Sequence, residues 1–164
     1  MQEKGTLSVN TENLMPIIKK WLYSDKDIFL RELVSNACDA ISKLDKLASM
    51  GQASMPQSAK VEIKADKDGG TLTVSDNGLG MTADEVRRYI NQVAFSGAYD
   101  FLEKFEEQSD AHDIIGHFGL GFYSAFMVAE KVVIETLSYQ PGAEAVRWES
   151  DGSSEYELSS GSRT

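Results

Sequence analysis

Glu32 and Asn36 are polar residues four positions apart in a stretch with helical periodicity. At that spacing two side chains of a helix project side by side. A carboxylate can take a proton from water, and an amide oxygen can bind a hard cation such as Mg²⁺. Helices also contain Glu and Asn at this spacing by chance, so a solvated helix flank is the alternative interpretation. The pair becomes informative only together with other segments.

A second candidate segment, residues 76–81, has the sequence Asp-Asn-Gly-Leu-Gly-Met and follows an expected strand. Its glycines permit a positive φ and let a ligand approach the backbone closely. A type I′ or II′ turn built from the Asn-Gly pair is the local alternative. Alternation places Asp76 on the same face as Leu72 and Val74, where a carboxylate is costly without a partner. Asp76 could therefore accept a hydrogen bond from an exocyclic amino group such as that of adenine.

The third segment, residues 116–122, has the sequence Gly-His-Phe-Gly-Leu-Gly-Phe and leads into an expected helix. Glycines before a helix N-terminus form an anion site from free N–H groups and the helix dipole. The segment is not a Walker A motif, because it lacks Gly-Lys-Ser/Thr, and it is not a Rossmann G-x-G-x-x-G. A single glycine loop is weak evidence. The three segments in this order are a much stronger signal.

The elements that must position these residues begin with a helix expected at roughly 27–48. Its apolar positions repeat every three to four residues. One polar stripe borders its apolar face and consists of Glu32, Asn36, Asp39 and Lys43. A hairpin is expected next, because apolar and polar residues alternate in 61–65 and 72–74, on either side of an Asp-Gly-Gly turn. Thr82 and Glu85 predict a capping box for a helix that ends near residue 90.

Further elements complete the pattern. Residues 6–9 could form a short strand, and Thr11 can cap an amphipathic helix through residue 22. Residues 91–121 look irregular, and a long irregular stretch is usually functional or mobile. A short buried helix is expected at 122–128, before three strands around residues 132–134, 145–148 and 156–158. This order predicts an α+β fold, a two-layer α/β sandwich with a mostly antiparallel sheet covered on one face by helices.

The composition is that of one folded domain, with 164 residues, 41% of them hydrophobic and 26% charged. A net charge of −10 argues against a protein that binds nucleic acid through phosphate contacts. It does not exclude a nucleotide, because backbone N–H groups and a metal can hold a small phosphate ligand. Cys38 is the single cysteine, which indicates the reducing cytoplasm. Neither a signal peptide nor a membrane-spanning run is recognisable, so no membrane partner is expected.

Together, these segments resemble the N-terminal ATPase domain of the ninety-kilodalton heat-shock chaperones of the bacterial HtpG type, within the Bergerat-fold ATPase superfamily. The resemblance covers essentially the whole chain and is most specific at residues 28–37, 76–82 and 119–126. It implies a Bergerat α/β sandwich that binds ATP or ADP with Mg²⁺. It also implies a full-length homodimer whose lid closes on nucleotide and whose partners are unfolded or partly folded client proteins.

The resemblance further implies a role for each matching residue. Glu32 would be the general base that activates water, and Asn36 would bind Mg²⁺. Asp76 would accept from the adenine amino group, in a pocket lined by Ala40, Gly80 and Met81. The backbone of Gly119, Leu120, Gly121 and Phe122 would hold phosphate, with residues 91–121 as the lid.

Several positions depart from the family pattern. The family lid has a lysine where this chain has Phe95 and usually an asparagine where it has Tyr89. The family glutamine in the glycine loop is replaced by His117. The resemblance also implies that residues 1–164 form a nucleotide-binding domain shortened at its C-terminal end, without middle and dimerisation domains. Nucleotide binding by this chain is then expected to be measurable and hydrolysis very slow.

Two other functions remain as alternatives. An ATPase module of the related DNA-repair and topoisomerase branch shares the Asn and Asp-x-Gly-x-Gly elements, but the acidic charge and the Phe-Gly-x-Gly-Phe-Tyr-Ser run count against it. A binding-only nucleotide module, in which Glu32 performs no chemistry, is the second.

Overall fold

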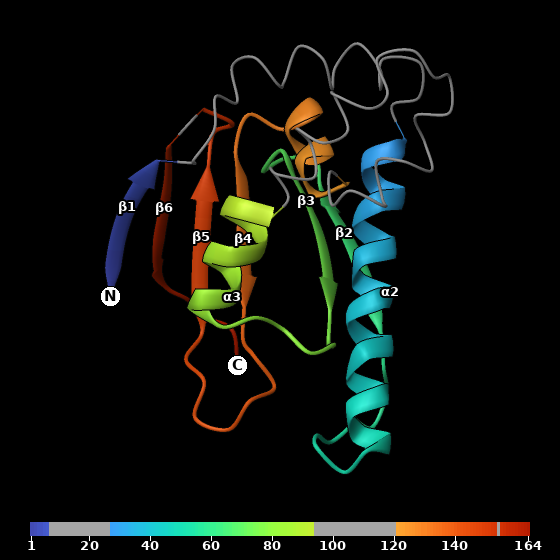
Figure 1. Cartoon of the computed structure of the whole chain (residues 1–164). Helices are drawn as coiled ribbons and strands as arrows, with labels where there is room; N and C mark the ends of the chain where they lie inside the picture. The colour runs from blue at the N-terminus through green and yellow to red at the C-terminus, as the bar shows by residue number, and fades with distance from the viewer. Residues whose placement is uncertain (7–26, 94–120, 154) are drawn as a thin grey trace, which may run out of the picture.

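The computed structural model describes residues 1–6, 27–93, 121–153 and 155–164, in which strands and helices form two neighbouring groups (Figure 1). The strands are β1 (Gln2–Thr6), β2 (Val61–Asp66), β3 (Thr71–Asp76), β4 (Val132–Thr136), β5 (Val146–Ser150) and β6 (Glu155–Ser160). The helices are α2 (Ile28–Ser49), α3 (Ala83–Arg88), the π-helical turn η1 (Tyr89–Val93) and the 3₁₀ helix η2 (Gly121–Met127).

Four strands form an antiparallel sheet in the order β1-β6-β5-β4. Because side chains alternate between the two faces of a strand, β5 directs Val146, Trp148 and Ser150 into the interior and its charged residues outward. Register pairs Trp148 with Leu158 of β6 and with Ile134 of β4, so large apolar side chains lie next to one another on the inner face.

Strands β2 and β3 form a separate antiparallel hairpin. Its turn is closed by Asp66, whose Oδ1 accepts the amides of Asp68 at 3.1 Å and Gly69 at 2.9 Å. The predicted alternation is present, but the expectation that this face is half-buried is wrong toward the turn. Ile63 is 50% exposed and Leu72 45% exposed.

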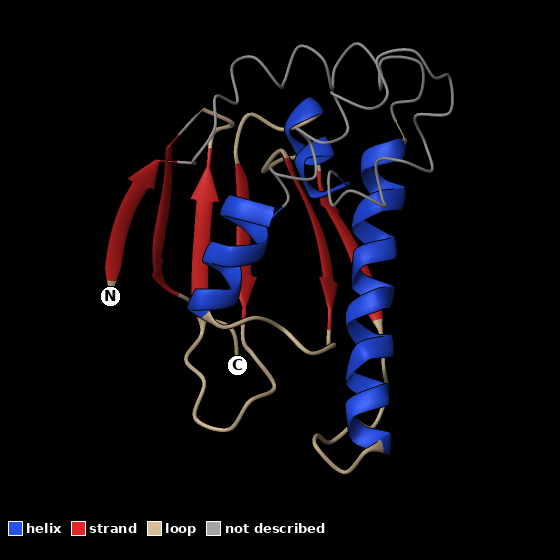
Figure 2. Ribbon diagram, in the orientation of Figure 1, coloured by secondary structure: helices blue, strands red, loops and turns tan. Residues whose placement is uncertain are grey.

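Helix α2 confirms the strongest prediction of the sequence, with one residue of difference at each end. Its buried residues Ala37 and Leu44 share one face, whereas Ile28, in the first turn, lies on the opposite side of the helix and belongs to the hydrophobic core cluster. The helix packs against the β2–β3 hairpin and against η2 (Figure 2). Helix α3 begins at the predicted capping box, in which the Glu85 amide donates to the Thr82 hydroxyl at 3.3 Å and the Thr82 amide donates to the Glu85 carboxylate at 2.7 Å.

The core lies between the four-stranded sheet and the short helices α3 and η2. Trp148, Leu158 and Val86 are completely buried in it. Phe122 of η2 meets the Trp148 ring edge to face at 5.6 Å. Two buried polar groups also find partners here, since the Tyr123 hydroxyl donates to the Ile90 carbonyl at 2.6 Å and the Trp148 indole donates to Asn91 Oδ1 at 2.9 Å.

The predicted fold class is confirmed, as an α+β arrangement in which every strand pair of the described residues is antiparallel. The expected short helix at 122–128 is the 3₁₀ helix η2, and the helix expected to continue to residue 90 changes at Tyr89 into a π-helical turn. A strand near the N-terminus is present at Gln2–Thr6, and residues 7–9 of the range where one was expected lie outside the described residues. The helix predicted from Thr11 lies outside the described residues.

Candidate functional site

Helix α2 presents Glu32, Asn36 and Ala40 in a row. Successive members are one turn apart, so the row runs along about 12 Å of the helix. Glu32 and Ala40 are half-buried, whereas Asn36 is exposed. The polar stripe predicted from the sequence divides here, because Asp39 and Lys43 form an exposed ion pair with each other at 2.7 Å. The part of the stripe at Asp39 and Lys43 is therefore a solvated flank, as one interpretation expected. The part at Glu32 and Asn36 is the candidate site.

The loop that follows β3 lies directly against the Ala40 end of this row. The Leu79 amide donates to the Ala40 carbonyl at 3.2 Å. A Cβ on Gly78 would lie only 2.5 Å from the Ala40 carbonyl carbon, so only glycine permits this approach. A type I′ or II′ turn at Asn77-Gly78 is excluded, because neither residue has a positive φ.

Asp76 stands half-buried at the end of β3. One carboxylate oxygen, Oδ1, accepts the Gly78 amide at 2.8 Å, and among the described residues the other oxygen has no hydrogen-bond partner. The neighbouring Asn77 side chain is occupied elsewhere: it accepts from the Lys60 amide at 2.8 Å and donates to the Ser58 carbonyl at 2.7 Å. Asp76 is therefore the residue of this loop that retains a free acceptor.

Gly80 and Met81 continue the loop toward α3. Gly80 has φ +61°, a left-handed conformation that favours glycine. The Met81 amide donates to the Thr136 hydroxyl at 2.9 Å, and the Met81 side chain packs against the edge of the core. The loop thus contacts α2 at Ala40 through Gly78 and Leu79, with Asp76 just before this contact and Gly80 and Met81 just after it.

At the other end of the row, α2 contacts the start of η2. Gly121 is buried there, and a Cβ at this position would lie 3.0 Å from Glu32 Cβ and overlap the Glu32 carboxylate. The Gly121 carbonyl accepts a short hydrogen bond from the Ser124 hydroxyl. Phe122 directs its ring into the core, so its backbone is the part near the site. The predicted site residues Gly119 and Leu120, and the lid positions Phe95 and His117, lie outside the described residues.

Burial governs the electrostatics of Glu32. Desolvation raises the pKa of its carboxyl above the ordinary glutamate range, and the charge of the adjacent Arg31 partly opposes this. A carboxylate whose pKa is raised toward neutrality binds a proton more readily, which suits a general base.

Two contacts of the site were not anticipated from the sequence. Thr136, at the end of β4, holds the Met81 amide, and the Arg163 guanidinium donates to the Asp76 carbonyl oxygen. The partners are separated by 55 and 87 positions in the chain. No local pattern indicates such pairs, because they depend on how the sheet and the hairpin sit together.

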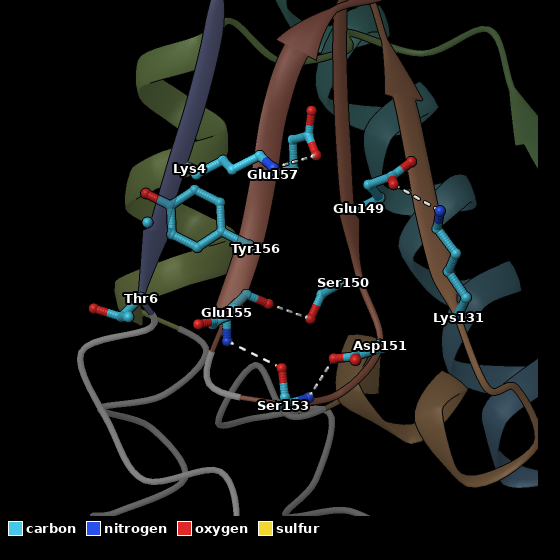
Figure 3. A pocket seen from close by; sticks show the side chains of 11 residues that line it. Lys4, Thr6, Lys131, Glu149, Ser150, Asp151, Ser153, Glu155, Tyr156 and Glu157 are labelled. Atoms are coloured by element: carbon cyan, nitrogen blue, oxygen red, sulfur yellow. Dashed lines mark hydrogen bonds and ion pairs between the residues drawn. The ribbon is translucent and has the colours of Figure 1, made fainter.

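A shallow groove elsewhere on the molecule contains none of the predicted site residues (Figure 3). It lies over β1, β6 and β5, and its polar side chains mainly form hydrogen bonds and ion pairs within the groove. Lys131 pairs with Glu149 at 2.6 Å, and the Ser150 hydroxyl donates to the Glu155 carbonyl at 2.8 Å. We therefore place the candidate site at α2 and not in this groove.

Within the ranges that the structure describes, no three His, Cys, Asp or Glu side chains gather into a metal-binding cluster. Within the same ranges, no helix is long and apolar enough to cross a membrane.

Residues 24–158 match the family described as histidine kinase-, DNA gyrase B-, and HSP90-like ATPase. The chain is similar to the chaperone protein HtpG of Bacteroides thetaiotaomicron, with 57% identity over 95% of the chain and 22% of that protein. HtpG of Porphyromonas gingivalis is 54% identical over 96% of the chain and 23% of that protein. The mitochondrial TNF receptor-associated protein 1 homolog of Dictyostelium discoideum is 40% identical over 96% of the chain and 23% of that protein. The chain therefore spans less than a quarter of the length of these relatives.

Proposed function

Because the chain belongs to the histidine kinase-, DNA gyrase B- and HSP90-like ATPase family, we propose that it binds ATP and ADP along α2. One observation supports this most strongly: α2 meets the Asp76–Met81 loop at Ala40 and the start of η2 at Glu32. A base-recognising end and a phosphate-recognising end then lie on one helix, at a separation suited to one extended nucleotide.

At the Ala40 end we assign the adenine. The free oxygen of Asp76 would accept a hydrogen bond from the exocyclic amino group. Ala40, Gly80 and Met81 would line the flat faces of the base, since they present small or apolar surface beside Asp76.

At the Glu32 end we assign the phosphates and Mg²⁺. Magnesium in nucleotide sites usually takes one or two protein oxygens and completes its shell with phosphates and water. The exposed amide of Asn36, one turn from Glu32, fits this donor set, because its oxygen is free to face a cation. The ion would neutralise phosphate charge in this acidic chain. The backbone of Gly119, Leu120, Gly121 and Phe122 would hold the phosphates.

Hydrolysis would use Glu32 as the general base. Its carboxylate would take a proton from a water molecule as the oxygen of that water attacks the terminal phosphorus, and ADP would leave. The raised pKa of Glu32 favours this proton transfer. We expect hydrolysis by this chain alone to be very slow.

For the whole protein, we propose a chaperone cycle driven by this ATPase. The relatives named HtpG are chaperones, which supports unfolded or partly folded proteins as clients. We also propose a homodimer, and a role in the stress response. Cys38, a free and exposed cysteine, supports a cytoplasmic location, and the net charge of −10 counts against nucleic acid as a partner.

The direct test is isothermal calorimetry with ADP and Mg²⁺. The wild-type chain should bind, and Asp76→Asn should weaken binding by at least about tenfold, because an amide replaces a charged acceptor. Asp68→Asn removes the same charge from the exposed hairpin turn and should leave affinity unchanged. Guanine has a carbonyl where adenine has its amino group, so GDP should bind far more weakly. No heat with ADP well above micromolar concentration would refute the proposal.

The catalytic assignment is tested with Glu32→Ala in a single-turnover assay. Retained ADP binding with lost hydrolysis supports Glu32 as the base. Unchanged hydrolysis would remove that role. Absent hydrolysis in both proteins would favour the binding-only module.

A further inference from the structure

We propose that residues 136–139, which we call the supporting segment, position the Asp76–Met81 loop that would bind the base. Within this segment, Thr136 is the positioning residue. The inference rests on the proposed nucleotide site and deepens it. Thr136 touches no ligand in this scheme. It acts through the backbone of residues 79–81, whose placement determines how well the base fits.

The contact of Thr136 with the loop is specific and buried. Its hydroxyl accepts the Met81 amide at 2.9 Å, and Thr136 is only 7% exposed. Met81 is the residue where the loop turns into α3, and the next amide, that of Thr82, is already committed to Glu85. Water cannot readily replace the hydroxyl at so buried a position, so its loss would leave the Met81 amide without a partner.

Two further contacts join the supporting segment to the loop. The Tyr139 amide donates to the Leu79 carbonyl at 2.8 Å. Gly80 lies so close to the next backbone that a Cβ would overlap the Leu137 carbonyl oxygen and lie 2.5 Å from its carbon. The two segments therefore touch backbone to backbone at Leu79 and Gly80, and the Thr136 side chain holds Met81.

Helix α2 holds the same loop from the opposite side. The Ala40 carbonyl accepts the Leu79 amide, and Gly78 rests on the Ala40 backbone. Leu79 consequently has its amide tied to α2 and its carbonyl tied to the supporting segment. A loop fixed from both sides is preorganised, which saves the ordering cost that a flexible loop would pay when a base binds.

This arrangement predicts that loss of the Thr136 hydroxyl weakens the binding of the base and leaves the binding of the phosphates unchanged. In Thr136→Val the shape is retained and the hydroxyl is lost, so residues 80–81 should move while the phosphate end stays in place. ADP and adenosine should then both bind about fivefold more weakly, by the same factor, because one buried hydrogen bond of the loop is lost. Thr136→Ser retains the hydroxyl and should bind nearly as the wild type does.

The matched control is Ser150→Ala. Ser150 is also buried, and its hydroxyl donates to the Glu155 carbonyl at 2.8 Å and accepts the Gly152 amide at 3.2 Å, on the far part of the same sheet. This variant removes two hydrogen bonds of a buried hydroxyl without touching the loop. Its affinity for ADP and adenosine should equal that of the wild type.

The experiment combines calorimetry with amide hydrogen exchange of the free protein. We expect Thr136→Val to increase exchange at Leu79 and Met81 selectively, and Ser150→Ala not to do so. Wild-type affinity in Thr136→Val, or equal weakening in Thr136→Val and Ser150→Ala, would overturn the inference. Unchanged exchange at Met81 in Thr136→Val would also overturn it, and this readout needs no ligand. If the wild type binds no ADP, the proposed function fails whatever the exchange result.

Discussion

The Glu32 carboxylate lies directly against the backbone of Gly121, with no room for a side chain between them. Gly121 does not have a positive φ, so its backbone conformation is open to any residue. Contact with Glu32 is therefore the reason that glycine is required here. The Glu32 side chain and the start of η2 therefore pack closely against each other.

Gly121→Ala should therefore destabilise the protein by about 1–3 kcal/mol, as overpacking of a buried site does. In a Glu32→Ala background the carboxylate is gone, although Glu32 Cβ would still lie close, so the cost of Gly121→Ala should fall by about 1 kcal/mol. Urea unfolding of the four proteins measures this coupling. Strictly additive effects would show that the carboxylate does not occupy the space beside Gly121.

The pH dependence of stability should report the burial of Glu32. Its pKa is raised by desolvation, so the folded state favours the protonated form. The stability that this preference contributes is present below the unfolded value of about 4.3 and is lost as the pH rises through the raised folded value. Glu32→Gln lacks this loss, so its stability relative to the wild type should increase from acidic to neutral pH.

Thermal unfolding of both proteins across this range is the measurement. Glu144→Gln, at an exposed position in the β4–β5 connection, controls for the removal of one formal charge. A constant difference between Glu32→Gln and the wild type at all pH values would contradict the burial of Glu32.

Local patterns predicted the elements of this fold well. Helix α2 was found because its apolar residues repeat at the helical period, and α3 because Thr82 and Glu85 form a capping box. Alternation predicts the hairpin but not the exposure of Ile63, because exposure depends on which other elements pack against the strand. Alternation identifies the faces of a strand and leaves open what covers them.

The same distinction holds for the site. Glu32 and Asn36 could be singled out from a spacing of four, and Asp76 from a carboxylate at a strand end. The sequence could not separate the reasons for the two glycines of the loop. Gly80 has a positive φ, whereas Gly78 does not and is required by its approach to Ala40. Close approaches between distant segments follow from tertiary packing, which also explains why Thr136 was missed.

The first strand is tied to α3 by an ion pair whose effect should depend on pH. Arg87 Nη2 lies 2.5 Å from Glu3 Oε2, and the Tyr156 hydroxyl donates to Glu3 Oε1 at 3.2 Å. The hydrogen bond from Arg87 lowers the pKa of Glu3. The resulting stability is present above the ordinary glutamate range and is lost as the pH falls through the lowered value.

Glu3→Gln should accordingly lower the Tm slightly at neutral pH and have no effect in acid. Glu155→Gln, an exposed glutamate of β6 without an ion pair among the described residues, is the matched control. High salt should reduce the difference, because the pair is partly accessible to solvent. An equal loss of Tm in both variants would mean that Arg87 contributes nothing specific.

The hydrogen bond between Trp148 and Asn91 should show the cost of an unpaired polar group in the core. Trp148 is completely buried, and its indole N–H is 2.9 Å from Asn91 Oδ1. Trp148→Phe removes the donor and leaves the buried Asn91 oxygen without it, so we expect the free energy of unfolding to fall by about 2–3 kcal/mol.

Asn91→Leu, added to Trp148→Phe, replaces the acceptor by an apolar side chain of similar size. The double variant should therefore recover about 1 kcal/mol relative to Trp148→Phe, because two apolar groups in contact need no hydrogen bond. Urea unfolding followed by circular dichroism measures the wild type and both variants, and a double variant less stable than Trp148→Phe would show that Asn91 has a second structural role in η1.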